Sequence, residues 1–171
     1  MRRQQTLRQE PEFRRFGFPN PQGMHVTLRF LGPTPASRVA ELDEALGPVL
    51  CGFAPLELRV RGVGAFPSPA RPRVLWANVE AISGDLALVR QAVEDTVVRL
   101  GFPREEKPFH AHITLARIKD ALHQDLISRL GVSAAGPDFG SFAADSVTLW
   151  RSDLLPGGAR YTGLATWPLK G

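Results

Sequence analysis

The chain has 171 residues, of which 43% are hydrophobic, and it carries a formal net charge of +4. This length and apolar content suffice for one domain with a buried core. No stretch approaches the roughly 20 consecutive apolar residues of a membrane-spanning helix, so we expect no membrane association. The positive charge is compatible with a nucleic-acid partner but does not identify one.

The N-terminus and the single cysteine both favour a cytoplasmic protein. Met1 to Gln5 is basic, but the apolar run that a secretory signal requires does not follow it. Cys51 cannot form an internal disulfide and lies in a segment with helical character. We interpret it as a small buried hydrophobe in a reducing compartment. We expect the protein to be a monomer.

Helix and strand patterns alternate through the first half of the chain. Thr34 followed by Pro35 resembles a helix start, and apolar residues follow at helical spacing. Glycine and proline mark turns, and period-two alternation marks strands. The expected elements are a weak helix over 7–16, a turn over 17–23, a buried strand over 25–32, a helix from Thr34 to Val49, a strand over 56–61, a loop over 62–72 and a strand over 73–80.

The second half repeats this plan. Asp85 is a typical first residue of a helix, and Gly101 and Pro103 mark its end. The expected elements are a helix over 85–100, a strand over 112–117, a short helix over 122–130, and strands over 145–151 and 160–167 on either side of a turn-rich segment.

This order of elements predicts an α+β fold. The glycine-rich turn of a dinucleotide-binding unit is missing. We predict a single domain over residues 1–171 with two pseudo-symmetric lobes. Each lobe is expected to be an antiparallel sheet with helices on its outer face, and the two sheets are expected to line a central cleft.

A short motif that occurs twice gives the strongest indication of function. His25-Val26-Thr27-Leu28 is matched by His112-Ile113-Thr114-Leu115, and the two copies begin 87 residues apart. Because side chains alternate along a strand, each histidine shares a face with the threonine two residues later. One such motif is common by chance, but two copies with matching neighbours predict a paired site.

Two histidines on opposite sides of one small group suit acid–base chemistry at phosphorus. Imidazole titrates near neutral pH, so one ring can act as the base and the other as the acid. We therefore predict that His25 and His112 are catalytic. Thr27 and Thr114 can donate to phosphate oxygens, and Arg117 supplies a planar positive fork. Carbonyl chemistry would need a nucleophile elbow or a Cys–His pair, and the sequence offers neither.

Two alternatives remain open from the residues alone. Strict alternation places Arg117 opposite His112, so Arg117 reaches the site only if the strand ends or bulges there. Arg29 shares its parity with His25 and is an alternative cation. His110 and His112 form a His-x-His pair that could suggest zinc, but a third and fourth ligand at suitable spacing are lacking. We predict neither a metal nor a cofactor.

The two motifs resemble the paired signatures of the 2H phosphoesterases, in particular the bacterial and archaeal RNA 2′,3′-cyclic phosphodiesterases, historically called 2′-5′ RNA ligases. Gly64 to Ser68 followed by Arg71 to Trp76 also resembles the central hairpin of this family. The similarity runs from Gly23 to the C-terminus. Family members usually begin with a short apolar strand, whereas this chain begins with Met1 to Gln5. We therefore expect either an upstream start or an uncovered sheet edge.

The resemblance implies a bilobed fold and metal-free hydrolysis of a 2′,3′-cyclic phosphate, on RNA or a nucleoside, to a 2′-phosphomonoester. His25 corresponds to the acid that protonates the departing 3′ oxygen, and His112 to the base that activates water. The phosphate-holding groups correspond to Thr27, Thr114 and Arg117. The alternatives are 2′-5′ ligation by the same histidines and non-catalytic binding of RNA ends. Further possible substrate contacts are Arg29, Phe66, His110 and Tyr161.

Overall fold

The computed structural model describes residues 11–13, 16–121, 123–155 and 158–171. Its elements, in chain order, are η1 (Pro11–Phe13), η2 (Pro21–Gly23), η3 (Ala36–Arg38), α2 (Val39–Cys51), β1 (Leu56–Ser68), β2 (Arg71–Ser83), α3 (Leu86–Arg99), β3 (His112–Arg117), α4 (Gln124–Arg129), β4 (Ser133–Ala144), β5 (Ser146–Leu155) and β6 (Gly158–Pro168), where η denotes a short 3-10 helix.

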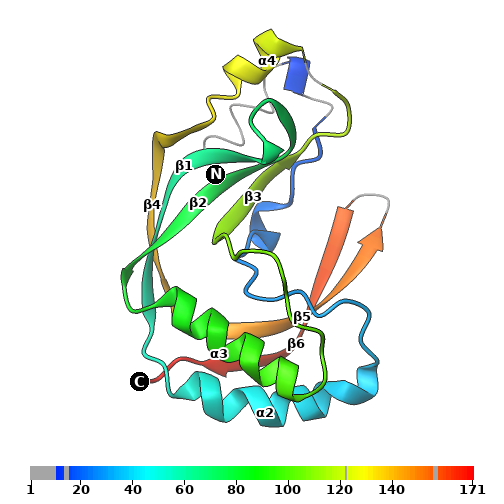
Figure 1. Ribbon diagram of the computed structural model, residues 1–171, viewed down its shortest axis with the longest axis vertical. Helices are drawn as coiled ribbons and strands as arrows, with labels where there is room; N and C mark the ends of the chain where they lie inside the picture. The colour runs from blue at the N-terminus through cyan, green and yellow to red at the C-terminus, as the bar shows by residue number, and fades with distance from the viewer. Residues whose placement is uncertain (1–10, 14–15, 122, 156–157) are drawn as a thin grey trace.

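The strands in these residues form two antiparallel sheets (Figure 1). The larger has the order β3-β2-β1-β4, and the smaller consists of β5 and β6. The predicted α+β class with two antiparallel sheets is confirmed. The expectation for the start of the chain concerns residues outside the described ranges.

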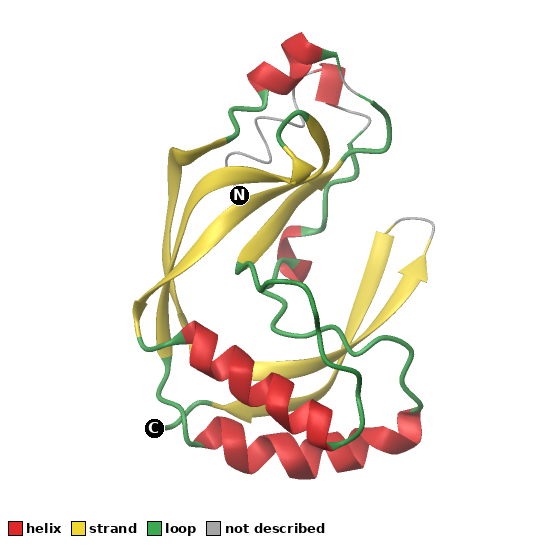
Figure 2. Ribbon diagram, viewed as in Figure 1, coloured by secondary structure: helices red, strands yellow, loops and turns green. Residues whose placement is uncertain are grey.

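One hydrophobic core links the sheets to the two longer helices. Leu58 and Val60 of β1 are buried in the same cluster as Val89 and Val93 of α3. Helix α2 packs against α3 and β6, and Figure 2 shows the two helices side by side at one end of the molecule. Trp167 of β6 anchors this contact, because its indole Nε1 donates to Asp43 Oδ1 of α2 at 2.6 Å. The smaller sheet is thereby fixed to the helical layer.

Helix α3 begins and ends where the sequence predicts. The Asp85 carboxylate accepts hydrogen bonds from the backbone amides of Ala87 and Leu88, at 2.9 and 3.0 Å. These amides have no partner within the helix, so the side chain supplies one. At the other end, Gly101 has a φ of +87°, a conformation that glycine adopts without strain.

The loop predicted over residues 62–72 is wrong. Strand β1 continues to Ser68 and β2 begins at Arg71, so the two form one long hairpin. Gly62 has a φ of +79° and lies at a register shift between Arg61 and Val63. The glycine therefore marks a bulge within a strand rather than the start of a loop.

Strand β4 was not predicted. Its sequence contains Gly136, Pro137 and Gly140, which are typical of loops. In the structure it pairs along β1, with register shifts on either side of Arg61. Its position at the edge of the larger sheet is the place where proline and glycine are tolerated in a strand.

The expected strand over residues 25–32 is also wrong. This stretch forms a single bridge, between Val26 and Ile113, and it bends at Leu28. The expected alternation breaks because the Arg29 side chain bonds to the Pro103 carbonyl and to Glu94 instead of facing outward with His25. Beyond this point the chain leaves the edge of β3.

The helix expected from Thr34 begins later, at Val39, after the short turn η3. The Thr34 hydroxyl donates to the Gly32 carbonyl at 3.2 Å and does not cap the helix.

Helix α4 confirms the short helix of the second half, although Leu122 lies outside the described residues. The weak helix over residues 7–16 also falls largely outside them, and Pro11–Phe13 forms only the turn η1. None of the helices described has the length and apolar character that crossing a bilayer requires.

Candidate active site

The bridge between Val26 and Ile113 brings the two motifs side by side. In antiparallel register this pairing sets His25 opposite Thr114 and Thr27 opposite His112. The four side chains then project from one face, because they flank the bridging pair. The two histidines are diagonal partners, a relationship that typically separates residues by about 7–8 Å. This spacing leaves room for one phosphoryl group between the rings.

Both imidazoles are held by the same local contact. Nδ1 of His25 lies 2.8 Å from the carbonyl oxygen of Gly23, and Nδ1 of His112 lies 2.7 Å from that of His110. A carbonyl oxygen only accepts, so each Nδ1 is the donor. In the neutral ring, Nε2 then carries the lone pair. The two motifs therefore present equivalent Nε2 atoms, each fixed by a carbonyl two residues earlier.

Aromatic side chains from the central hairpin surround His112. The Phe66 ring is 5.2 Å from His112 and 5.1 Å from Trp76, measured between ring centroids. The rings of His110 and Phe66 are 6.1 Å apart. Phe66 and His110, both predicted from the sequence, thus lie beside the second motif. Trp76 was not predicted as a site residue. The structure places it beside the second motif, as the register partner of Thr114.

Trp76 occupies this place because its cross-strand neighbour is a glycine. Gly64 is its register partner, and a Cβ at that position would lie 2.1 Å from the indole ring. Only a residue without a side chain allows the ring to cover the strand there. The pairing of Gly64 with Trp76 depends on the register of the hairpin, which the sequence alone does not specify.

Tyr161 of β6 lies against the first motif. Its ring is 4.9 Å from the His25 ring in an edge-to-face arrangement. The Gly23 backbone, which supplies the carbonyl for His25, also faces the tyrosine ring. Tyr161, which was predicted as a possible substrate contact, therefore lies against both His25 and the backbone of Gly23.

A bulge in β3 settles the parity of Arg117. Leu75 of β2 pairs with Ala116, but the next residue, Trp76, pairs with Thr114, so that Leu115 is the extra residue. The insertion of one residue shifts the alternation by one place. Arg117, which pairs with Val74, consequently shares the face of Thr114 and His112. Its side chain is exposed on that face.

Arg29, the alternative cation, is engaged elsewhere. Its Nε lies 2.7 Å from Glu94 Oε2 of α3, and the exposed fractions of the two side chains are only 7% and 1%. Its guanidinium also donates to the carbonyl of Phe30 at 2.6 Å and to that of Pro103. These contacts direct Arg29 toward α3, so the structure favours a role in positioning the first motif over contact with substrate.

The face of the larger sheet that carries His112 continues into a polar row. Asn78 is the register partner of His112, and Arg61 is that of Asn78. Neither was predicted as a site residue, because this row depends on strand order. Farther along the face, Arg59 Nε donates to Asp138 at 3.0 Å. This hydrogen bond, with that from the Gly140 amide, lowers the pKa of Asp138 below its ordinary value.

The donor set near His112 does not resemble a zinc site. The His110 carbonyl serves His112, and the His110 ring packs with Phe66 and Trp76. Within the described residues, no three side chains of His, Cys, Asp or Glu gather as ligands around one point. Structural zinc takes four ligands, and catalytic zinc takes three protein ligands.

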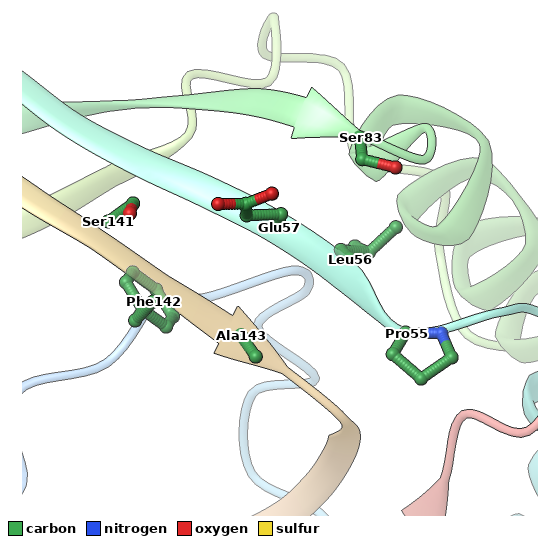
Figure 3. A pocket seen from close by; sticks show the side chains of 7 residues that line it. All are labelled: Pro55, Leu56, Glu57, Ser83, Ser141, Phe142 and Ala143. Atoms are coloured by element: carbon green, nitrogen blue, oxygen red, sulfur yellow. The ribbon is translucent and has the colours of Figure 1, made fainter.

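A separate groove of about 450 Å³ lies at the far end of the larger sheet (Figure 3). It is lined by Pro55, Leu56, Glu57, Ser83, Ser141, Phe142 and Ala143. Its only charged side chain is a carboxylate, which repels phosphate. The groove contains none of the motif residues, and we do not assign the chemistry to it.

Comparison with known proteins identifies the family. The profile of the 2′-5′ RNA ligase superfamily matches residues 3–155. The chain belongs to the 2′-5′ RNA ligase superfamily. An RNA 2′,3′-cyclic phosphodiesterase of Aeropyrum pernix is 36% identical over 143 residues, which cover 84% of this chain and 80% of that protein. One of the same name from Methanothermobacter thermautotrophicus is 30% identical over 152 residues, covering 89% and 82%.

Two solved structures share the fold of this chain. TT0787 of Thermus thermophilus matches with a TM-score of 0.79 and 30% identity, covering 99% of this chain and 91% of that one. E. coli LigT complexed with 3′-AMP matches with a TM-score of 0.69 and 27% identity, covering 90% and 81%. The family predicted from the two motifs is confirmed.

Proposed function

We propose that this protein is an RNA 2′,3′-cyclic phosphodiesterase that uses His25 and His112 as a metal-independent acid–base pair. The observation that carries the proposal is the matched pair of Nδ1 contacts, which leaves an equivalent Nε2 on each ring. The Val26–Ile113 bridge sets the two rings on one face. Membership of the 2′-5′ RNA ligase superfamily and the names of the curated relatives support the same activity.

In the proposed reaction, neutral His112 accepts a proton from water through Nε2 while the water oxygen attacks phosphorus. The bond from phosphorus to the 3′ oxygen breaks, and protonated His25 donates its Nε2 proton to that oxygen. The products are a 2′-phosphomonoester and a 3′ hydroxyl. Proton transfer by positioned side chains contributes typically about 10²–10⁴-fold to such a step. After the reaction His112 is protonated and His25 is neutral. Before a second turnover, His112 must release a proton to solvent and His25 must take one up.

Three side chains are proposed to hold the non-bridging phosphate oxygens. Thr27 and Thr114 share the face of the histidines through the bridge register, and Arg117 joins them through the Leu115 bulge. Donors that are already fixed where charge develops stabilise the transition state without reorganising. The planar guanidinium can give two parallel hydrogen bonds to a phosphate.

The same residues leave two other functions to be separated by experiment. A ribose hydroxyl in place of water would give a 2′-5′ linkage, the reaction suggested by the superfamily name. A non-catalytic binder of RNA ends would use the same face without turnover. The presence of both histidines, each with its orienting carbonyl, favours an enzyme over a binder.

The decisive test is an assay of adenosine 2′,3′-cyclic phosphate in excess chelator, with separation of the 2′ and 3′ phosphate isomers. We expect turnover to the 2′-phosphate only. A parallel reaction with a 5′-hydroxyl RNA measures ligation. Binding without turnover would support the non-catalytic function, and activity that chelation abolishes would contradict the two-histidine mechanism.

A further inference from the structure

Trp150 of β5 stands apart from the other two tryptophans. Trp167 is buried, and Trp76 is covered by the rings around the second motif. Trp150 is 50% exposed. Tryptophan and tyrosine side chains are enriched at binding interfaces.

The indole of Trp150 packs with one side against the backbone of β6 at Gly163. Gly163 is its register partner on β6, and a Cβ at that position would lie 3.6 Å from the indole atom Cζ3. Its ring also meets the edge of Tyr161 at 6.5 Å between centroids. The ring therefore rests on the strand backbone and on Tyr161 and keeps its other side open. This repeats the arrangement of Trp76 over Gly64 in the larger sheet.

Trp150 continues a line of rings that starts at His25. Tyr161 contacts His25 on one side and Trp150 on the other. Alternation along β5 places Trp150 on the same sheet face as Ser152, the register partner of Tyr161. The line thus leads from the first histidine along one face of the smaller sheet.

An RNA strand leaving the site would pass this line in order. The terminal nucleoside carries the cyclic phosphate and must lie next to His25, so Tyr161 is the ring within its reach. The next nucleotide then lies one ring farther out. Single-stranded RNA is typically bound by aromatic side chains on which successive bases stack.

Charged side chains occupy the other face of the hairpin, opposite Trp150. Arg151 and Arg160 both pair with one carboxylate, Asp153, at 3.4 Å. Two guanidinium groups share one negative charge, so the hairpin keeps a positive excess. From that face they do not contact a base on Trp150, and they contribute only a long-range attraction for an RNA backbone.

We propose that Trp150 binds the base of the penultimate nucleotide by stacking, so that an RNA strand is a better substrate than a nucleoside 2′,3′-cyclic phosphate. This inference rests on the proposed function and adds to it a subsite for the base of the penultimate nucleotide.

The test compares two substrates, adenosine 2′,3′-cyclic phosphate and the dinucleotide ApA with a terminal 2′,3′-cyclic phosphate. The readout is the ratio of kcat/KM for the dinucleotide to that for the mononucleotide. We expect Trp150→Ala and Trp150→Leu to lower this ratio by about 5- to 100-fold, which corresponds to about 1–3 kcal/mol of stacking. Trp150→Phe should retain most of it.

Leu154→Ala is the matched control. Leu154 is 87% exposed and shares the face of Trp150 on β5, so its removal should leave the ratio unchanged. A wild-type ratio near one, or an unchanged ratio in a folded Trp150→Leu protein, would overturn the inference while the proposed function stands. Turnover of neither substrate by the wild type would instead contradict the proposed function.

Discussion

Arg29 Nε and Glu94 Oε2 lie 2.7 Å apart in a nearly solvent-free contact that ties the first motif to α3. Arg90, one turn before Glu94, approaches the same carboxylate oxygen at 3.5 Å. The other oxygen, Oε1, accepts the Glu105 amide at 2.7 Å. One buried carboxylate therefore serves two cations and a loop amide, and it fixes the segment that follows His25 and Thr27.

Replacing Glu94 with Gln should strongly destabilise the protein. The change removes the buried carboxylate that Arg29 and Arg90 share and leaves Arg29 only the longer contact with Glu105 at 3.5 Å. Breaking a buried ion pair from one side costs about 3–5 kcal/mol. Urea unfolding followed by circular dichroism measures this loss in free energy. Glu41→Gln is the control, because Glu41 pairs with Arg38 at the exposed start of α2 and exposed pairs contribute little. Equal stability of the two variants would mean that the Glu94 network does not hold the fold together.

His25→Ala and His112→Ala should each lower kcat by about 10²–10⁴-fold, because each removes one proton-transfer group. The two act in one transition state, so the double variant should lose much less than the product of the single losses. Single-turnover kinetics on the cyclic phosphate, with circular dichroism as the check of folding, measures both effects. Near wild-type kcat in either single variant would contradict the mechanism.

The threonine hydroxyls and the Arg117 guanidinium should each contribute to transition-state binding. Thr27→Val and Thr114→Val keep the shape while removing a donor, so each should cost about 1–3 kcal/mol in kcat/KM. Arg117→Lys should also lower kcat/KM, since an ammonium does not replace a planar fork. Full activity in Arg117→Ala would show that the Leu115 bulge does not serve the phosphate and would require another cation.

The dependence of kcat on pH should be bell-shaped, with limbs that belong to the histidine pair as a unit. His110→Ala should keep most of the activity, because the backbone carbonyl that orients His112 remains in place. A zinc mechanism would make His110 as necessary as His112 and would lose activity on chelation. Rate profiles of wild type and His110→Ala, with and without chelator, distinguish the two.

The hydrogen bond from Arg59 should make the stability of the β1–β4 contact depend on pH. It lowers the pKa of Asp138 in the folded state. The hydrogen bond therefore contributes to the free energy of unfolding at pH values above the ordinary aspartate pKa. This contribution is lost as the pH falls through the pKa that Asp138 has in the folded protein. The urea midpoints of wild type and Asp138→Asn should therefore differ at about pH 7 and converge in acid, below the ordinary pKa of an aspartate. A difference that stays constant with pH would assign the effect to packing.

Features that depend on local pattern were predictable from the sequence. The capping Asp85 and the apolar stripe after it define α3, and the β-branched run of the second motif defines β3. The histidines and threonines were found because the motif repeats. The bridge brings the two copies side by side, and the matched carbonyl contacts hold both histidine rings in the same way.

Features that depend on distant partners were not predictable. β4 is stabilised by pairing with β1, which compensates for its glycine and proline content. The parity of Arg117 depends on the β2–β3 register, and the direction of Arg29 depends on a carboxylate of α3. Trp76 enters the site because a glycine on another strand leaves room for it. No local pattern in the sequence contains these relationships.

The bridge between Val26 and Ile113 also bears on the order of events in folding. It joins positions 87 residues apart, so it closes a long loop and belongs to the nonlocal contacts that slow folding. His25 also needs Tyr161, near the opposite end of the chain, and His112 needs the hairpin that carries Phe66. Neither half can build the site alone. In refolding, catalytic activity should therefore return after helical circular dichroism, since it reports the closure of the whole chain.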